Sequence, residues 1–338
     1  MSTKEYILSL LETNRGQSIS GAHIAEQLGI SRNAVWKAIK ELEKDGYRID
    51  AITNKGYCLC KDNDIISAQG IYPFLSQRSR EKVTDKIHIH ASLESTNKTA
   101  KEMAIAGAEH GTIIIADYQT AGKGRYGRTF HSPPGCGIYM SLILHPAQLC
   151  LNTPTLATHF AAVSVCEAIE AISDKQPKIK WVNDIFLEGR KICGILTEAV
   201  TDFESGVMQW IVIGIGINFS TSAASFPEDV RHIAGAVFDN DHPPTIRNHL
   251  IAEVINRILL TKSQYEDEQT KDKEQEILDS YRERLMVLGK NVLVSGAGEP
   301  YEATAIDIDN AGHLIVKKDN GEHLSLSTGE ISIKIKSK

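Results

Sequence analysis

The chain has 338 residues, of which 42% are hydrophobic and 24% charged, and its formal net charge is −6. This length allows two or three domains, and the composition is that of an ordinary soluble globular protein. We see no apolar run that approaches the roughly 20 residues needed to cross a bilayer, and no signal-peptide layout, so we expect a cytoplasmic protein. The six cysteines include no C-x-x-C pair, which argues against a zinc site and a disulfide framework.

The N-terminal region carries a slight excess of positive charge. Residues 1–61 contain nine Lys/Arg and seven Asp/Glu, while the whole chain is acidic. Apolar spacing predicts three short helices there, the second from Ser20 to Gly29 and the third after the N-cap Ser31. Two short helices joined by a glycine-containing turn are typical of a helix-turn-helix.

The third helix is expected to present a polar, basic outer face that consists of Arg32, Asn33, Trp36, Lys37 and Lys40. A recognition helix contacts base edges with its first turn, and lysines further along contact phosphates. Alternating residues around Asn54-Lys55-Gly56 predict a hairpin with Lys55 at its tip. We therefore predict a winged helix-turn-helix DNA-binding domain over 1–61, in which Ser20 and Ser31 also lie near DNA. A winged helix used for protein contacts is the alternative.

The next region alternates strands with helices. Residues 62–85 are polar and mixed, and we place a linker near 61–67. The pattern then predicts a mixed α/β domain over 67–284 with most of its core in one sheet. Predicted strands lie at 87–90, 112–116, 138–144, 179–187, 191–198 and 211–219, with a helix over 98–108.

The most informative stretch is Gly122–Arg128, which combines three glycines with three cations. Its spacing satisfies G-x-G-x-x-G, but a dinucleotide fingerprint must open a helix, whereas this run lies between two predicted strands. Glycines let backbone N–H groups approach an anion closely, and Lys123, Arg125 and Arg128 add charge. We predict a cationic glycine loop suited to phosphate; a solvated basic hairpin is the alternative.

Two further features allow both a structural and a functional interpretation. Ser95-Thr96-Asn97 precedes the predicted helix at 98–108, and capping alone would explain it. Lys180 lies inside an apolar strand, where its charge is costly to bury unless a counter-charge or a ligand anion meets it. A salt bridge to Asp184 or Glu198 is the structural alternative.

The C-terminal part changes pattern again. From residue 285 onward, short alternating strands separated by Gly, Asn and Asp predict a small all-β barrel over 285–338. The run 266–284 before it is highly charged, and we expect a solvated helix there.

Six segments, in this order and spacing, resemble those of biotin protein ligases. With the winged helix, the chain is similar to the bifunctional type that also represses the biotin operon. Three positions depart from the family pattern: Lys123 stands where arginine is usual, Val182 where proline is usual, and Phe130 where repressors often carry tryptophan. The segments are Ser95–Asn97, Asp117–Thr120, Gly122–Arg128, Lys180–Asp184, Lys191–Leu196 and Gly214–Asn218.

The resemblance implies a multidomain α+β protein whose central domain is related to class II aminoacyl-tRNA synthetases and whose C-terminal domain is an SH3-like barrel. It implies that biotin and ATP, with Mg²⁺, form biotinyl-5′-AMP and that biotin passes to a lysine of the biotin carboxyl carrier protein of acetyl-CoA carboxylase. It also implies an adenylate-bound homodimer that binds operator DNA. A ligand-sensing transcription factor without chemistry and a lipoate-type ligase are the alternatives.

The resemblance also assigns roles to residues. Arg125 and Lys180 would be catalytic, with Asp184 as a possible proton acceptor in the transfer step. No protein metal ligands are expected. Biotin would contact Ser95, Thr96, Asn97, Gln119, Lys123 and Gly124 beside the two catalytic residues, and the nucleotide would contact Arg128, Phe130, Asn183, Lys191 and Asn218.

Overall fold

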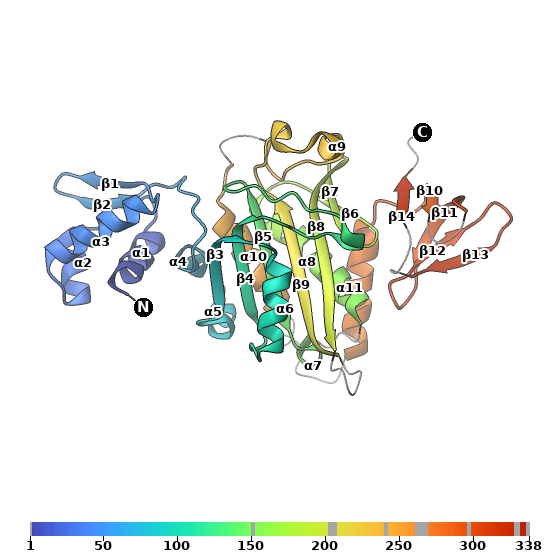
Figure 1. Ribbon diagram of the computed structural model, residues 1–338, viewed down its shortest axis with the longest axis horizontal. Coiled ribbons are helices and arrows are strands. Elements are labelled where there is room, and N and C mark those ends of the chain that lie inside the picture. Colours follow the sequence, from blue (N-terminus) through green and yellow to red (C-terminus); the bar gives the residue numbers. More distant parts are fainter. Residues whose placement is uncertain are drawn as a thin grey trace.

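The computed structural model describes residues 2–149, 153–201, 208–239, 243–260, 270–295, 299–327 and 332–335. Figure 1 shows three parts in a row: a helical domain with a hairpin at the N-terminal end, a central sheet flanked by helices, and a smaller sheet at the C-terminal end.

The N-terminal part has the predicted elements. Gly29 ends the second helix in the left-handed conformation with φ 63°, and Ser20 and Ser31 cap the second and third helices. The two strands pair in the register Ile49↔Leu59, which gives the predicted wing. The elements are α1 (Thr3–Thr13), α2 (Gly21–Leu28), α3 (Arg32–Lys44), β1 (Ile49–Ile52) and β2 (Gly56–Leu59).

The segment after the wing is more ordered than its polar composition suggests. Three short helices follow, and the side chains of Ile71, Leu75 and Val83 are buried in the core of the central domain. Residues 68–83 therefore pack into the central domain and are not part of an exposed connection. The helices are α4 (Ala68–Ile71), η1 (Tyr72–Phe74) and α5 (Gln77–Val83).

A seven-stranded sheet, in the order β3-β4-β5-β9-β8-β7-β6, forms the centre of the molecule. Strands β3 and β4 are parallel and are joined through α6 (Thr96–Ile105), whereas every other neighbouring pair is antiparallel. The strands are β3 (Ile87–Leu93), β4 (Thr112–Gln119), β5 (Gly137–Leu144), β6 (Lys178–Lys180), β7 (Asp184–Leu187), β8 (Arg190–Thr201) and β9 (Met208–Asn218).

Helices cover both faces of this sheet. Ile113 and Ile115 of β4 point into the large core beside α8 and α10, whereas Ile114 points to α6, because successive strand residues face opposite sides. Neither α8 nor α10 is among the elements predicted above. The remaining helices of this part are η2 (Arg125–Gly127), α7 (Pro146–Leu149), α8 (Pro154–Ile172), η3 (Ala223–Ser225), α9 (Glu228–Arg231), α10 (Arg247–Leu260) and α11 (Thr270–Arg284).

Helix α8 is long and apolar enough to cross a membrane, contrary to the expectation from the apolar runs. However, 72% of its apolar window is buried inside the protein. It runs behind the central sheet, with α10 on one side and α11 on the other (Figure 1). The helix is therefore hydrophobic because it forms the core.

Two other expectations are wrong. Residues 179–187 do not form one strand: β6 and β7 pair as an antiparallel hairpin around the turn 181–183. Helix α11 is not simply solvated, since Leu278 and Tyr281 are buried against the core. The many charged residues of α11 obscure its apolar face in the sequence, although Tyr281 is fully buried.

The C-terminal part is a five-stranded antiparallel sheet in the order β13-β12-β11-β10-β14. Short strands separated by turns are the expectation for this region, and the described residues contain five of them. Val292, Ala305, Leu314 and Val316 are fully buried and join the main core. The strands are β10 (Asn291–Ser295), β11 (Tyr301–Ile308), β12 (Leu314–Lys317), β13 (His323–Leu326) and β14 (Ser332–Ile335).

Candidate functional site

A cavity of about 450 Å³ opens at the end of the central sheet where β4 and β9 finish and β5 begins. It brings together every residue that the sequence analysis placed near biotin or the nucleotide, although these residues are spread over more than 120 positions of the chain. They are Ser95, Thr96, Asn97, Gln119, Lys123, Gly124, Arg125, Arg128, Phe130, Lys180, Asn183, Lys191 and Asn218.

The start of α6 supplies buried polar groups to one end of the cavity. Ser95 occupies the N-cap position, but its side chain makes no capping hydrogen bond. The amide Nδ2 of Asn97 donates to the Leu196 carbonyl at 3.0 Å and to Glu198 Oε2 at 2.8 Å. Gly214 leaves room for this side chain, since a Cβ there would lie 2.0 Å from Asn97 Oδ1. Capping alone therefore does not account for the Ser95–Asn97 segment.

The glycine loop connects the antiparallel strands β4 and β5, so it is not a dinucleotide-binding turn. The loop is closed across its base, because Gly124 N donates to Arg128 O at 2.7 Å and Phe130 N to Gly122 O at 2.9 Å. Arg125 reaches across the cavity, where its Nη1 donates to Asn183 Oδ1 at 3.2 Å. The loop is thus part of the cavity wall as well as a solvent-exposed turn.

Phe130 packs against the glycines of the opposite strands. A Cβ at Gly216 would lie 2.5 Å from the Phe130 ring, and one at Gly194 would lie 3.2 Å from it. Side chains of the protein itself thus lie directly against the glycines of β9. These glycines let an aromatic ring form part of the cavity wall.

The hairpin turn between β6 and β7 places Lys180 and Asn183 at the cavity. Lys180 Nζ lies 5.7 Å from the centroid of the Phe186 ring. The two acids considered as its structural partners are bound by other lysines: Asp184 by Lys191 at 2.7 Å, and Glu198 by Lys101 at 2.6 Å.

The other two residues of this turn, Trp181 and Val182, form hydrogen bonds with the C-terminal part of the chain. Trp181 Nε1 donates to the carbonyl of Gly312, in the β11–β12 turn of the C-terminal sheet, at 3.1 Å. Tyr281 of α11 donates its hydroxyl hydrogen to the Val182 carbonyl at 2.9 Å. The C-terminal part of the chain therefore supports the turn that carries the candidate site.

One wall of the cavity comes from a segment that the sequence reasoning missed. The segment is anchored beside Lys191, whose N–H donates to Ile233 O at 2.7 Å and whose carbonyl accepts from Gly235 N at 2.9 Å. Asn218 Nδ2 donates to Gly235 O at 2.9 Å. The composition of residues 226–234 carries no signal that marks this segment as part of a binding site. The cavity-lining residues of this segment are Phe226, Pro227, Asp229, Val230, Ile233 and Ala234.

Cysteine chemistry finds no support at this site. Cys193 lies on β8, and complete burial raises the pKa of its thiol well above the usual range. A buried thiol of this kind is a poor nucleophile. The other described cysteines are also unpaired, and Cys150 lies outside the described residues.

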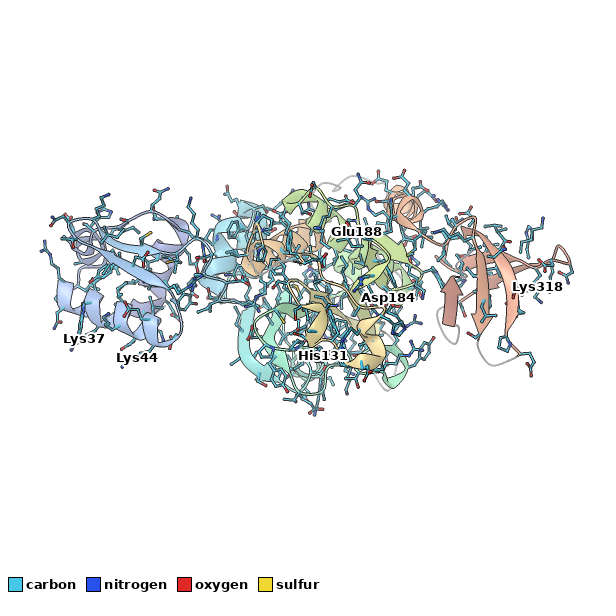
Figure 2. The ribbon with its side chains drawn as sticks, turned by 90° about the horizontal axis from the view of Figure 1, so that it is seen from above. Lys37, Lys44, His131, Asp184, Glu188 and Lys318 are labelled. Carbon is cyan, nitrogen blue, oxygen red and sulfur yellow. The ribbon has the colours of Figure 1, made fainter. Side chains whose placement is uncertain are left out.

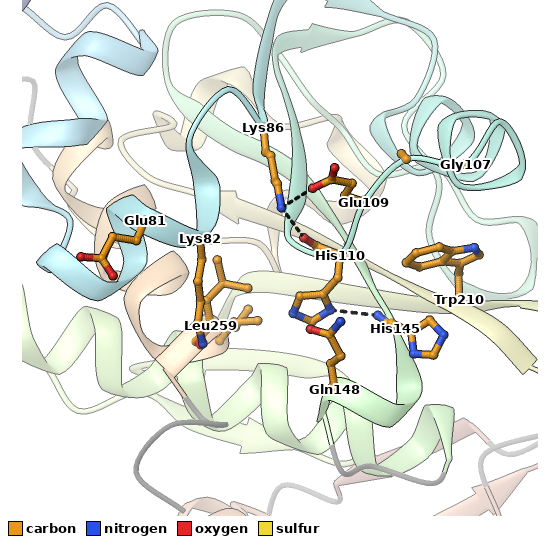
Figure 3. Close-up of a pocket in the computed structure, with 12 residues that line it drawn as sticks. Glu81, Lys82, Lys86, Gly107, Glu109, His110, His145, Gln148, Trp210 and Leu259 are labelled. Carbon is orange, nitrogen blue, oxygen red and sulfur yellow. Dashed lines mark hydrogen bonds and ion pairs between the residues drawn. The ribbon is translucent and has the colours of Figure 1, made fainter. Parts of the chain in front are cut away.

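A second hollow, of about 530 Å³, lies at the opposite end of the strands. Figure 3 shows Lys86 bound to Glu109 at 2.7 Å and to the His110 carbonyl at 3.2 Å, with Trp210 beside the His145 ring. Lys82 donates to the Leu259 carbonyl at 2.6 Å. Both lysines of this hollow thus bind acceptors of the protein.

The predicted DNA-contacting residues lie on the N-terminal domain. Figure 2 places Lys37 at the end of the molecule that is far from Asp184 and His131 in the central domain. Ser20 and Ser31 are occupied as caps, accepting from His23 N at 3.0 Å and Ala34 N at 3.2 Å. The other predicted residues are exposed on α3 and at the wing tip, namely Arg32, Asn33, Trp36, Lys37, Lys40 and Lys55.

One of these cations is partly neutralised. Lys40 Nζ lies 2.6 Å from Glu43 Oε2. Trp36 is 49% exposed, which is unusual for so large an aromatic side chain. Trp36 thus lies on the same exposed face of α3 as Arg32, Asn33, Lys37 and Lys40.

Comparison with known protein families agrees with this layout. Residues 89–218 match the model of the biotin/lipoate A/B protein ligase family, residues 3–58 match an HTH domain, and residues 287–334 match the biotin protein ligase C terminal domain.

Full-length relatives extend the match. The chain is 36% identical over 318 residues to the bifunctional ligase/repressor BirA of Bacillus subtilis, and the match covers 93% of this chain and 94% of that protein. It is 28% identical over 336 residues to the BirA of Salmonella typhimurium, with 97% and 96% covered. The fold is shared with the biotin protein ligase from Aquifex aeolicus in complex with biotin and ATP, at a TM-score of 0.62 and 24% identity over 74% of this chain and 99% of that chain. The chain therefore belongs to the biotin protein ligase family and has the domain composition of its bifunctional ligase/repressors.

Proposed function

We propose that this protein activates biotin with ATP to form biotinyl-5′-AMP and transfers biotin to a lysine of the biotin carboxyl carrier protein of acetyl-CoA carboxylase. We also propose that the adenylate-bound form represses biotin synthesis genes. One observation carries the ligase function: a single cavity joins a buried polar end to five cationic side chains. These are Lys123, Arg125, Arg128, Lys180 and Lys191.

The first step needs electrostatic stabilisation more than covalent help from the protein. A carboxylate oxygen of biotin attacks the α-phosphorus of ATP, and the bond to pyrophosphate breaks. Both reactants are anions, so fixed cations that lie between them lower the barrier. We assign Arg125, Lys123 and Lys180 to this point. The Asn183 contact holds the Arg125 guanidinium in place at 3.2 Å.

The two ends of the cavity suit the two substrates. The polar end at Ser95, Thr96, Asn97 and Gln119 fits the ureido ring of biotin, which needs both donors and acceptors. We assign the nucleotide to the side formed by Arg128, Phe130, Asn183, Lys191 and Asn218. Mg²⁺ enters as part of the ATP substrate, held mainly by the phosphates.

In the second step the lysine amine of the carrier attacks the acyl carbon, and AMP leaves. The amine must lose a proton, and Asp184 is our candidate acceptor because it lines the cavity. Asp184 also forms an ion pair with Lys191 at 2.7 Å, which holds its carboxylate at the cavity wall.

The repressor function is assigned to the N-terminal domain. We propose that a homodimer formed with bound adenylate places two copies of α3 in successive major grooves of operator DNA. Arg32 and Asn33 would contact base edges, with Trp36 beside them. Lys37, Lys40 and Lys55 would contact phosphates, and Ser20 and Ser31 would lie near the backbone.

The domain boundaries and the fold relationships of the domains are also proposals. We propose domain boundaries at 1–61, 67–284 and 285–338, a central domain related to class II aminoacyl-tRNA synthetases, and an SH3-like C-terminal barrel. We place the protein in the cytoplasm, where the ATP that it consumes is available.

A transfer assay tests the ligase function. The full chain is incubated with ATP, Mg²⁺, an apo carrier domain and labelled biotin, with labelled lipoate in parallel. Biotin on the carrier lysine is the expected result. Lipoate transfer instead would identify a lipoate-type ligase, and ligand binding without adenylate formation would identify a ligand-sensing transcription factor.

A further inference from the structure

The side-chain amide of Gln119 is held by hydrogen bonds at both ends. Its Oε1 accepts from Thr96 N at 2.8 Å and from Thr96 Oγ1 at 3.2 Å, while its Nε2 donates to Ser132 Oγ at 2.9 Å. The hydroxyl of Ser132 in turn donates to the Phe130 carbonyl at 3.0 Å. Ser132 is 3% exposed, so it acts on the cavity only through Gln119 and the loop.

This chain of bonds has a single possible direction. A backbone N–H only donates, and a backbone carbonyl only accepts. Because the Thr96 N–H lies at one end and the Phe130 carbonyl at the other, every bond between them must point the same way. Gln119 must therefore turn its oxygen toward α6 and its nitrogen toward Ser132. Within the described hydrogen bonds, one N–H of Gln119 is left over for the cavity that it lines.

Gly122, the first glycine of the cationic loop, makes this arrangement possible. A Cβ at Gly122 would lie 2.5 Å from the Phe130 oxygen, 2.7 Å from Ser132 Oγ and 3.0 Å from Gln119 Nε2. No side chain fits at this corner without displacing the bonded groups. The base of the loop is thus built around the Gln119–Ser132 contact.

We propose that Ser132 is a positioning residue that makes Gln119 a hydrogen-bond donor to the ligand, and that this selects a cyclic urea over a cyclic guanidine. This inference rests on the proposed function, because it takes biotin as the ligand. A urea presents a carbonyl oxygen, which accepts a hydrogen bond from Gln119. A protonated guanidine presents an N–H at the same point, which leaves two donors facing each other.

The test compares two probes, biotin and 2-iminobiotin, in which the urea oxygen is replaced by nitrogen. Dissociation constants are measured by calorimetry near neutral pH, where the cyclic guanidine is protonated. In Ser132→Ala the Nε2 end of Gln119 loses its acceptor, so only the Thr96 contacts hold the amide and its remaining N–H no longer points at the ligand in a fixed direction. We expect biotin to bind about tenfold more weakly, and 2-iminobiotin to lose little or to gain. Preference for biotin over 2-iminobiotin should therefore fall by about tenfold or more.

Two controls separate positioning from general loss of structure. Ser132→Thr keeps the hydroxyl and should keep the preference. Ser141→Ala removes another fully buried serine of the same end, whose Oγ lies 2.8 Å from Thr96 Oγ1 and 2.7 Å from Asn97 Oδ1. Because Ser141 contacts Thr96 and Asn97 but neither Gln119 nor Ser132, this variant should weaken both probes by similar factors.

A second variant serves if Ser132→Ala does not fold. Gln119→Glu replaces the donor with an ionised acceptor and should reverse the preference toward 2-iminobiotin. The proposal is overturned if Ser132→Ala weakens both probes in parallel, or if Gln119→Glu leaves the preference unchanged. A wild-type chain that binds neither probe would refute the proposed function instead.

Discussion

Arg247 and Asp64 form an ion pair that ties the segment after the N-terminal domain to the central domain. Arg247 Nε lies 2.8 Å from Asp64 Oδ2, and its backbone N–H donates to Asp64 Oδ1 at 2.7 Å. The same guanidinium lies 2.6 Å from Asp117, two residues before Gln119 on β4. Although burial acts to lower it, the charges of Asp64 and Asp117 raise the pKa of Arg247. This arginine thus joins the linker to the strand that carries a candidate biotin residue.

Replacing Arg247 should therefore be costly. Arg247→Ala leaves two carboxylates without their cation, and we expect a loss of about 3 kcal/mol in the free energy of unfolding. Urea unfolding measures this change. Arg257→Ala on the same helix removes a more exposed pair with Glu253 and should cost less than about 1 kcal/mol. Equal losses in the two variants would contradict the role given to Arg247.

The contact between Gly312 and Trp181 predicts an effect of the C-terminal sheet on the ligase reaction. At Gly312, with φ +79°, a Cβ would lie 2.1 Å from His159 Cε1. Gly312→Ala should push this turn away from Trp181, lower the rate of pyrophosphate release by about tenfold and reduce thermal stability. Gly321→Ala is the matched control, because Gly321 has φ +88° and open space around it. If both variants behave alike, only backbone strain is involved.

Removing one cation from the ligase site and one from the DNA-binding surface should affect the two activities separately. Arg125→Ala removes the cation that bridges to Asn183, so adenylate should be released more readily and should label bystander proteins. Arg32→Ala should leave carrier biotinylation unchanged and weaken operator binding by at least about tenfold. Biotin blotting of a protein mixture and a DNA mobility shift measure both variants. Retained adenylate with normal selectivity in Arg125→Ala would count against its catalytic role.

His159 predicts a pH dependence of stability. Burial lowers the pKa of His159 to about 3, whereas the unfolded chain takes up this proton near 6.5. Between these values the unfolded state binds the extra proton. Stability should therefore fall, as the pH drops below about 6.5, by up to about 1.4 kcal/mol per unit.

Substitution isolates this contribution. His159→Leu places a non-titrating, apolar side chain of similar volume beside Tyr281. It should flatten the fall of the melting temperature between about pH 6.5 and 5. His323→Leu changes an exposed histidine of the C-terminal sheet and should leave the slope as it is. A slope that His159→Leu does not alter would show that another group controls acid lability.

Local signals were enough for the N-terminal domain. The caps Ser20 and Ser31, the left-handed Gly29 and the turn at Asn54–Gly56 act within a few residues of the chain. Backbone conformation at these positions depends on the residue itself and on its nearest neighbours. The elements of that domain could therefore be predicted in chain order.

Helices α8 and α11 show where local patterns fail. Helix α8 is apolar on nearly all sides because it is surrounded by core, so it has little of the periodicity that marks a surface helix. Helix α11 has a charged sequence, yet it buries Tyr281 and Leu278. In both cases packing against distant elements decides the environment.

The candidate site likewise combines features that were evident in the sequence with features that only the fold created. Residue types and spacing by themselves singled out the cationic glycine loop and Lys180, because phosphate and carboxylate groups demand cationic partners, whereas the role of the Ser95–Asn97 segment came from the resemblance to biotin protein ligases. Only the tertiary structure placed them around one cavity with Trp181 and the wall near Ile233. It alone decided that Gln119 presents an N–H, since that orientation depends on Thr96 and the Phe130 carbonyl meeting across a loop. Hydrogen-bond direction is a property of the whole bonded chain of groups, and no single residue in the sequence carries it.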